Sequence, residues 1–252
     1  MKISLITVSY NSEETIGDTF DSVERQIIDG FDLEYIHIDG LSRDKTIEIS
    51  NNYRNIISKS ISENDSGIYN AMNKGISIAT GEVIGFLNSD DAYCSNDILA
   101  SVANVFKDKK VKASYGDLNY VRRHNVSKIT RKWSSGRLRN HSFNFGWMPA
   151  HPTFFLRAEC YKSFGSFKEE INSSADYELM LRMLHVNKLP AKYIKKTMVS
   201  MRDGGNSGQS VAHRLKVFKE DMSAWNKNGL GLGLFPVCLK VIRKIPQFLR
   251  AI

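Results

Sequence analysis

The 252-residue sequence contains only three cysteines, and no two of them are spaced as a metal-binding or redox pair would be. Cys94, Cys160 and Cys238 are odd in number and far apart, which argues against a disulfide framework and favours a reducing compartment. No apolar run approaches the roughly 20 residues of a membrane-spanning helix. The apolar stretch 3–8 is too short for a signal peptide and ends at Ser9. We therefore expect a cytoplasmic protein.

Acidic residues are missing from two segments of the chain. Residues 122–141 contain seven Lys or Arg and no Asp or Glu, which predicts a basic, mobile excursion outside the core. Residues 229–252 also lack a carboxylate, are interrupted by Pro236 and Pro246, and mix apolar side chains with Lys240, Arg243, Lys244 and Arg250. This pattern is typical of a basic amphipathic tail at a membrane surface, and equally of a helix packed on the protein's own core. The net charge of +8 suits phosphorylated ligands, nucleic acid or anionic membranes alike.

Strand-like apolar runs alternate with helix-like segments, which predicts an α/β fold with a mostly parallel sheet covered by helices. The first helix is expected to be capped by Asn11 and Glu14 and to bury one face that includes Ile27. A turn is expected at 204–206. Strands are expected at 3–8, 35–38, 57–61, 83–87, 113–116 and 193–201, and further helices at 46–57, 67–79, 95–106, 175–185 and 210–225.

Acidic residues follow three of the predicted strands. They are Asp39, Asp65 and the pair Asp90 and Asp91. Ligands of a parallel sheet bind beyond the carboxyl ends of its strands, so these side chains are candidates for chemistry. Adjacent carboxylates repel one another unless a cation shares their site, and Mg²⁺ typically takes one or two carboxylates together with substrate phosphates. Each acid taken alone is also an ordinary residue of turns and helix caps.

Four segments, in this order, resemble the signatures of the family 2 glycosyltransferases: 7–11 (TVSYN), 38–46 (IDGLSRDKT), 62–75 (SENDSGIYNAMNKG) and 87–91 (LNSDD). The resemblance reaches to about residue 205. It implies the GT-A fold, with a Rossmann-like sheet, an inverting mechanism and a nucleotide-diphosphate sugar donor. Two positions depart from the family pattern, since Lys45 stands in place of a common Gly and Asn70 in place of a common Asp.

The resemblance also implies which residues contact the donor. Asp91, the last acid of the family's Asp-X-Asp-like element, would hold Mn²⁺ or Mg²⁺ between the two phosphates. A cation there stabilises the charge that develops on the departing diphosphate. The residues implied for the nucleotide sugar are Thr7, Val8, Tyr10, Asn11, Asp39, Asp65, Gly67, Lys74, Ser89 and Asp90.

Segments 149–155 (PAHPTFF) and 174–182 (SADYELMLR) resemble the family's late motifs, which belong to the acceptor side. Asp176 is the implied general base, which takes the proton of the attacking acceptor hydroxyl. Ala175 replaces the Glu that usually precedes this base. An Asp that opens a helix is also commonly a cap. His151 either positions the acceptor or diphosphate, or is structural.

The sequence thus predicts a glycosyltransferase domain at 1–228, with a nucleotide-sugar half (1–117) and an acceptor half (118–228), followed by the tail at 229–252. The expected reaction moves a hexose from a UDP-sugar to a lipid-linked oligosaccharide, in O-antigen, capsule or exopolysaccharide assembly at the cytoplasmic face of the inner membrane.

Two other functions compete with this prediction. A sugar nucleotidyltransferase would need a glycine-rich, basic triphosphate loop, which residues 8–12 do not provide. A non-catalytic basic module for nucleic acid or membrane explains the charge but leaves the acidic residues unexplained. No nucleic-acid partner is expected.

Overall fold

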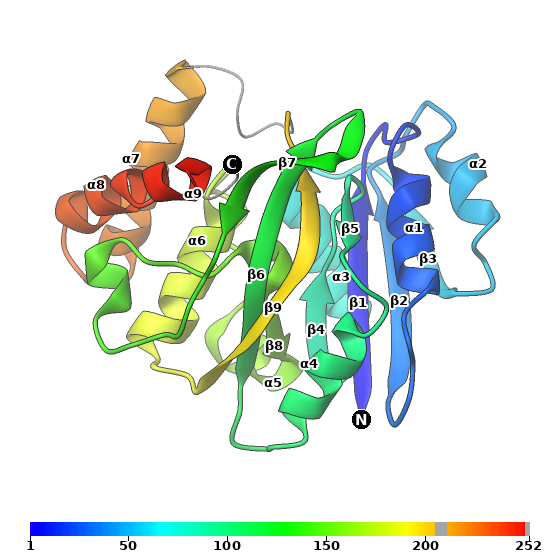
Figure 1. The fold of residues 1–252 in the computed structure, drawn as a ribbon, viewed down its shortest axis with the longest axis horizontal. Helices are drawn as coiled ribbons and strands as arrows, with labels where there is room; N and C mark the ends of the chain where they lie inside the picture. The colour runs from blue at the N-terminus through cyan, green and yellow to red at the C-terminus, as the bar shows by residue number, and fades with distance from the viewer. Residues whose placement is uncertain (205–210, 250–252) are drawn as a thin grey trace.

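The computed structural model describes residues 1–204 and 211–249, and within them nine strands form one sheet with helices on both faces (Figure 1). The strands are β1 (Lys2–Ser9), β2 (Asp32–Asp39), β3 (Ile57–Ser62), β4 (Val83–Phe86), β5 (Asp91–Tyr93), β6 (Ala113–Arg122), β7 (Asn125–Trp133), β8 (Phe155–Arg157) and β9 (Ala191–Arg202). The α-helices are α1 (Ile16–Glu24), α2 (Thr46–Asn51), α3 (Ile68–Ile78), α4 (Ile98–Phe106), α5 (Ala158–Phe164), α6 (Ala175–Met180), α7 (Val211–Lys227), α8 (Leu234–Ile242) and α9 (Ile245–Leu249). Shorter 3-10 turns are η1 (Ser142–Phe145) and η2 (His151–Thr153), and α6 continues as the π-helix η3 (Leu181–Val186).

The strand order is β3-β2-β1-β4-β8-β6-β9-β5, and β7 pairs with β6 outside this path. The predicted parallel sheet is confirmed for β3, β2, β1 and β4, whose carboxyl ends therefore meet at one edge. β8 runs antiparallel to both β4 and β6, whereas β9 is parallel to β6. The predicted boundary after residue 117 falls inside β6, so the two halves share one continuous sheet.

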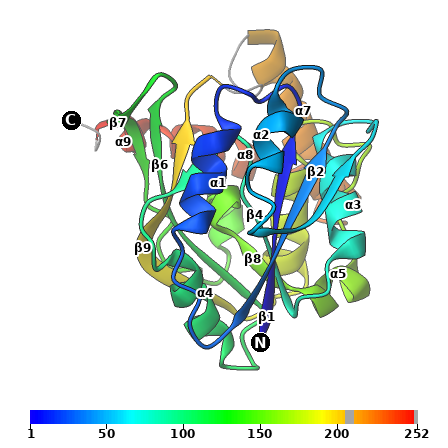
Figure 2. The same ribbon diagram turned by 90° about the vertical axis from the view of Figure 1, so that its right-hand side faces the viewer.

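The sheet buries a separate apolar cluster on each face because side chains of a strand alternate between its two faces. In β1, Ile3 and Leu5 join the cluster that contains α1 and α4, whereas Ile6 and Val8 join the cluster that contains α3, α5 and α6. Figure 2 shows α1 and α4 on one side of β1 and α3 and α5 on the other. Each such buried side chain stabilises the fold by roughly 1.5–3 kcal/mol.

The first helix differs from the prediction. α1 begins at Ile16 with Thr15 at the N-cap position, and Asn11 is not its cap. The carbonyl of Ser12 accepts hydrogen bonds from the main-chain N–H groups of Thr15 and Ile16, so a separate turn precedes the helix. Asn11 adopts a left-handed φ of +48°. Ile27, predicted on the buried face, lies beyond the end of the helix and is exposed.

The basic segment 122–141 is also more regular than predicted. About half of it, Asn125–Trp133, is β7, which forms an antiparallel hairpin with β6, so this part is a strand of the sheet and not the mobile excursion that was predicted. Lys and Arg are frequent on exposed edge strands, where charge prevents further strand pairing. Among the other predictions, the helix at 46–57 ends at Asn51, the strand at 113–116 continues to Arg122, and β8 and α5 were not predicted. The turn at 204–206 falls largely outside the described residues.

The tail contains two helices, and α8 packs on the body of the protein. Val237 is fully buried, and the Lys240 ammonium lies 2.8 Å from the Asp221 carboxylate of α7. The chain passes so closely over Gly146 that no Cβ fits there beside the main chain of Lys240. The outer face leaves exposed Leu234, Phe235, Val241, Ile242, Ile245 and Phe248. Within the described part of the chain, no helix is long and apolar enough to cross a membrane.

Candidate active site

Asp39 lies at the carboxyl end of β2, where it joins three strand ends. Its buried carboxylate accepts hydrogen bonds from the hydroxyls of Ser9 (2.9 Å), Ser42 (2.5 Å) and Ser62 (2.7 Å), and from the Ser42 main-chain N–H (2.9 Å). Burial raises the pKa of Asp39, but these donors outweigh burial and leave the pKa below its ordinary value. Asp39 therefore shapes the wall of the predicted nucleotide pocket as an ionised, fully hydrogen-bonded side chain.

Tyr10 and Asp65 lie together over Gly40, next to Asp39, and would form the rim of the predicted nucleotide pocket. A Cβ at Gly40 would lie 2.7 Å from the Asp65 carboxylate and 3.4 Å from the Tyr10 ring, so a glycine allows both side chains to close over β2. The Tyr10 ring is 62% exposed. The Lys74 ammonium bonds the Asn64 carbonyl (2.7 Å) and thereby fixes the loop that carries Asp65. An exposed ring beside a carboxylate suits a nucleoside, because the ring stacks on a base and the acid accepts its N–H or hydroxyl groups.

The remaining residues predicted for the nucleotide have structural contacts. Thr7 donates to the Leu87 carbonyl (2.7 Å), and the Val8 side chain is buried in the core. The Asn11 side chain accepts the Arg43 main-chain N–H (2.9 Å) and so orders the loop after β2. The Ser89 hydroxyl lies 2.8 Å from that of Ser12. Gly67, at the N-cap of α3, has a φ of +133° that glycine adopts readily.

The acidic pair follows β4 and begins β5. Asp91 is fully buried, whereas Asp90 is partly accessible. Burial raises the pKa of both carboxyls, and the charge of Asp90 raises that of Asp91 further. Among the described residues, one carboxylate oxygen of Asp91 and the amide oxygen of Asn88 are buried without a hydrogen-bond partner.

These oxygens fit a hard divalent cation. An unpartnered buried oxygen needs a donor or a cation, and a cation between two adjacent carboxylates removes their repulsion. In residues 1–204 and 211–249 no group of three His, Cys, Asp or Glu side chains is assembled as a metal site. Mg²⁺ does not require one, since substrate phosphates and water complete its coordination. Asp90 is partly exposed whereas Asp91 is fully buried, so the prediction that Asp91 is the ligand stays a prediction.

Asp176 lies in the first turn of α6, beside residues from distant parts of the chain. Its carboxylate accepts a hydrogen bond of 3.1 Å from the Tyr69 hydroxyl on α3. The His151 ring stacks on Phe86 with 6.3 Å between centroids and meets Phe167 edge-on at 5.9 Å. Burial lowers the pKa of His151, and the charge of Asp176 opposes this effect. His151 is thus neutral near pH 7 and within electrostatic range of Asp176.

Tyr120 connects the acidic pair with Asp176. Burial raises the pKa of this phenol, the guanidinium of Arg131 lowers it, and the carboxylates of Asp91 and Asp176 both raise it. The two acids that the sequence predicts as metal ligand and base thus both raise the pKa of one partly buried side chain of β6. Neither Tyr69 nor Tyr120 was singled out from the sequence. The signal for Tyr69 was its place in α3, whose buried face is Tyr69, Ala71, Met72 and Gly75.

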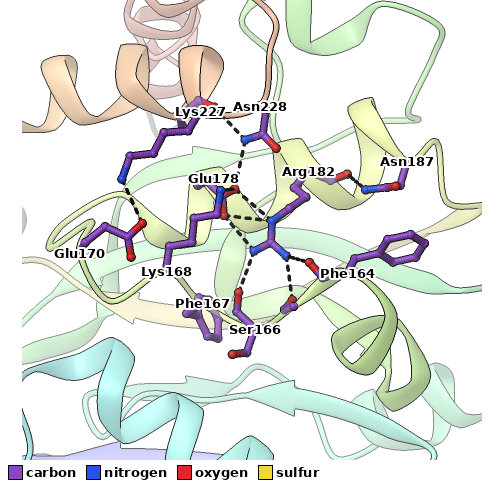
Figure 3. Close-up of polar contacts among 12 residues, drawn as sticks. Phe164, Ser166, Phe167, Lys168, Glu170, Glu178, Arg182, Asn187, Lys227 and Asn228 are labelled. Carbon is purple, nitrogen blue, oxygen red and sulfur yellow. Dashed lines mark hydrogen bonds and ion pairs between the residues drawn. The ribbon is translucent and has the colours of Figure 1, made fainter.

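A buried ion-pair network fixes α6 and with it Asp176 (Figure 3). The Glu178 carboxylate, which is 0% exposed, accepts hydrogen bonds from Arg182 (2.9 Å) and Asn228 (3.1 Å) and pairs with Lys168 (2.8 Å). Arg182 also donates to the carbonyls of Phe164, Gly165 and Ser166. The network ties the helix to the loop before Phe167 and to the end of α7.

The acidic pair after β4, the exposed Tyr10 ring and the separate carboxylate of Asp176 on α6 suit a transferase. Residues 4–164 match the family model described as "Glycosyl transferase family 2", so the chain belongs to that family and is a glycosyltransferase.

Among its curated relatives is a "PGL/p-HBAD biosynthesis glycosyltransferase" of Mycobacterium bovis, 25% identical over 215 residues that cover 84% of this chain and 80% of the relative. A "Poly(ribitol-phosphate) beta-glucosyltransferase" of Bacillus spizizenii is 33% identical over 132 residues, 51% of this chain and 21% of the relative.

Solved structures show the same fold. S. aureus TarS 1-349 in complex with UDP-GlcNAc superposes with a TM-score of 0.68 at 19% identity, over 100% of this chain and 79% of that chain. The mannosyltransferase PcManGT from Pyrobaculum calidifontis, in complex with GDP-Man and Mn²⁺, gives a TM-score of 0.66 at 15% identity, over 99% and 73% of the two chains. The predicted GT-A fold is thereby confirmed.

Proposed function

We propose that this glycosyltransferase moves a hexose from a UDP-sugar to an acceptor hydroxyl with inversion at the anomeric carbon. The observation that carries the proposal is a chain of contacts from the end of β4 to Asp176. Phe167 contacts the ring of Phe86, shortly before the acidic pair, and stacks on Tyr69, whose hydroxyl bonds Asp176. An acidic pair near a separate base suits a donor diphosphate and an acceptor. The Tyr10 and Asp65 rim then holds the nucleoside.

In the proposed mechanism Asp176 accepts the proton of the acceptor hydroxyl as that oxygen attacks the anomeric carbon. The bond from the anomeric carbon to the diphosphate oxygen breaks on the opposite face, and the diphosphate leaves with the electron pair. Tyr69 holds the carboxylate of Asp176 in place through its hydrogen bond. Asp90 and Asp91 would hold a divalent cation, Mn²⁺ or Mg²⁺, and the cation would supply positive charge that stabilises the leaving diphosphate.

Names of similar proteins support the donor, metal and setting in this proposal. TarS was solved with UDP-GlcNAc, and PcManGT with GDP-Man and Mn²⁺. Two curated relatives act, by name, in PGL/p-HBAD biosynthesis and on poly(ribitol-phosphate). We therefore propose a role in cell-surface glycan assembly, such as O-antigen or capsule, with a lipid-linked acceptor.

The proposed location is the cytoplasmic face of the inner membrane. Support comes from the outer face of α8 and α9, where exposed Phe235, Ile242 and Ile245 lie beside Arg243. An apolar face flanked by basic residues partitions into the interface of anionic membranes.

A donor panel tests the proposed activity. UDP-, GDP- and dTDP-hexoses are incubated with Mn²⁺ or Mg²⁺ and a membrane extract as acceptor source, and released nucleotide is measured. A parallel reaction contains a nucleoside triphosphate and a hexose 1-phosphate in place of the sugar nucleotide. We expect metal-dependent UDP release from one UDP-hexose, which Asp176→Asn abolishes. Turnover of only GDP- or dTDP-sugars would replace the proposed nucleotide. Consumption of nucleoside triphosphate without sugar transfer would favour a nucleotidyltransferase and overturn the proposal.

A further inference from the structure

The tail, the end of β7 and residues from the segment 134–148 line a cavity of about 270 Å³. Figure 1 shows α9 beside β7, at the end of the molecule toward which β1 runs. A water molecule occupies about 30 Å³ of liquid, so the space accommodates a group as large as a diphosphate. The side chains that line it and bear on its chemistry are Trp133, Trp147, Lys240, Arg243, Lys244 and Gln247.

The cavity is cationic and contains no carboxylate among its lining residues. Lys240 is neutralised by Asp221, but the ammonium of Lys244 has no hydrogen bond or ion pair within residues 1–204 and 211–249. Burial and the charges of Lys240 and Arg131 lower the pKa of Lys244 to about 8, against the opposing carboxylates of Asp221 and Asp176. An unpaired cation in such a place is costly unless an anion joins it.

Arg131 provides a second unsatisfied donor beside the cavity. Its Nε donates to the Gln247 side chain (2.9 Å), and its guanidinium lies 4.1 Å from the centre of the Tyr120 ring. Its Nη2 is buried and has no hydrogen-bond partner in the described part of the chain. Buried guanidinium N–H groups nearly always have a hydrogen-bond partner. We therefore expect a bound ligand to supply the acceptor for this group of Arg131.

The cavity lies beside α6, which carries the proposed base. The Lys240 ammonium, part of the cavity lining, lies 3.7 Å from the centre of the Tyr177 ring, and Tyr177 follows Asp176 in this helix. The charge of Asp176 also acts on Lys244. An anion held by Lys244 and Arg131 would thus lie on the acceptor side of the site.

We propose that this cavity binds a phosphate or diphosphate group of the acceptor, so that the C-terminal tail selects acceptors that carry phosphate near the reacting sugar. The assignment rests on the proposed function, because it takes Asp176 as the base that faces the acceptor. Phosphate oxygens form short, charge-assisted hydrogen bonds with Lys and Arg. Trp133 and Trp147 provide apolar surface for the group that is attached to the phosphate.

Calorimetric titration with phenyl phosphate tests the proposal in the full-length protein. UDP and Mg²⁺ are kept saturating so that the donor site is filled, and phenol serves as the uncharged probe. We expect phenyl phosphate to bind and phenol not to bind. Lys244→Gln should weaken binding about tenfold or more, since a hydrogen bond to a charged group contributes about 1.5–3 kcal/mol. Lys244→Arg should keep most of the affinity. Lys219→Gln, on the exposed face of α7, is the matched control.

Three outcomes would overturn the assignment. In the first, phenyl phosphate fails to bind the parent protein. In the second, Lys244→Gln weakens UDP binding as much as phenyl phosphate binding, which would show that the cavity is part of the donor site. In the third outcome Lys244→Gln affects only binding to vesicles of phosphatidylcholine with phosphatidylglycerol, which would make the ligand a membrane headgroup. Failure of the proposed function is distinct: phenyl phosphate binds as expected, but no UDP-hexose is turned over.

Discussion

The Tyr69 hydroxyl donates a 3.1 Å hydrogen bond to the carboxylate of Asp176, 107 positions later in the sequence, and so joins two helices. Tyr69 lies on α3, in the half of the chain whose loops form the nucleotide rim, and Asp176 opens α6 on the acceptor side. Burial and the charge of Asp176 raise the pKa of Tyr69 well above its ordinary value, so the phenol stays protonated and remains a donor. The base is thereby aligned before substrate arrives.

Replacing Asp176 with Asn tests its role as base. The amide keeps the size of the side chain but cannot accept a proton, so we expect kcat to fall about 10²–10⁴-fold while UDP affinity is unchanged. Steady-state kinetics and UDP titration measure the two effects. Asp29→Asn, a change at an exposed carboxylate, is the control. Transfer at the parental rate by a folded Asp176→Asn variant would remove Asp176 from the mechanism.

Asp91 is predicted to lower the stability of the folded protein when no metal is bound. Because its pKa in the folded protein is raised, the folded state binds more protons than the unfolded state above the ordinary aspartate pKa, and stability falls as pH rises through that range. Asp91→Asn removes this cost. We expect a higher Tm at neutral pH without metal, by about 2–4 °C for each kcal/mol recovered.

Mn²⁺ together with UDP should then raise the Tm of the parent but much less that of Asp91→Asn, as measured by calorimetry. The variant Asp90→Asn distinguishes the contributions of the two acids to metal binding, because Asp90 is partly exposed and Asp91 is buried. Equal Mn²⁺ stabilisation of the parent and of both variants would exclude the acidic pair as the metal site.

His37 is predicted to make the fold sensitive to mild acid. Burial lowers its pKa from 6.5 to about 4, against the opposing charge of Asp39, while its ring bonds Ser9 (2.8 Å) and Ser50 (2.9 Å). A base with a lowered pKa stabilises the folded state above its unfolded pKa, and this stability is lost as pH falls from 6.5 toward 4. We expect a loss of about 2 kcal/mol at pH 5 relative to pH 7.5, from linkage arithmetic. Urea denaturation of the parent and of His37→Asn at both pH values checks this, and an identical pH dependence in the two proteins would contradict it.

The network in Figure 3 allows a matched comparison of buried and exposed ion pairs. Arg182→Met leaves the buried Glu178 without its main partner and should destabilise the protein by about 3–5 kcal/mol. Lys227→Met breaks the exposed pair with Glu170 and should cost less than about 1 kcal/mol. Denaturant unfolding measures both, and costs of similar size would show that Glu178 does not depend on Arg182.

The sequence predicted the parallel strands and the acidic junctions well because both are local signals. A strand such as β4 is a short apolar run, and the acids after it are adjacent in sequence. The hydrogen bond of Tyr69 to Asp176 and the stacking of His151 on Phe86 could not be predicted, since they depend on how α3, α6 and β4 pack. Composition was misleading for β7, where basic side chains on an edge strand look like a loop.

The residues predicted to bind the nucleotide show a second limit of prediction from sequence. Motif positions identify which residues lie near a ligand, but not which way their side chains point. Thr7 and Val8 turn into the core and Asp39 is saturated by serine hydroxyls, whereas Tyr10 and Asp65 present their side chains at the rim. The sequence is equally compatible with a tail that binds a membrane surface and with a tail that packs on the protein's own core. Packing of α8 is confirmed by its buried Val237, and membrane binding remains a prediction.

Membrane binding of the tail is best tested without deleting it. Removing 229–252 would uncover the site of buried Val237 and leave Asp221 without Lys240, so loss of binding could reflect misfolding. Phe235 is 64% and Ile242 56% exposed on the outer face, so the double change to Ser leaves the packed face intact. Full burial of each such side chain in a bilayer interface contributes roughly 1.5–3 kcal/mol. We expect the double variant to bind phosphatidylglycerol vesicles at least about tenfold more weakly in sedimentation assays, whereas Ile28→Ser, at an exposed site far along the chain, binds like the parent. Equal sedimentation of all three proteins would show that Phe235 and Ile242 on the outer face do not bind the membrane.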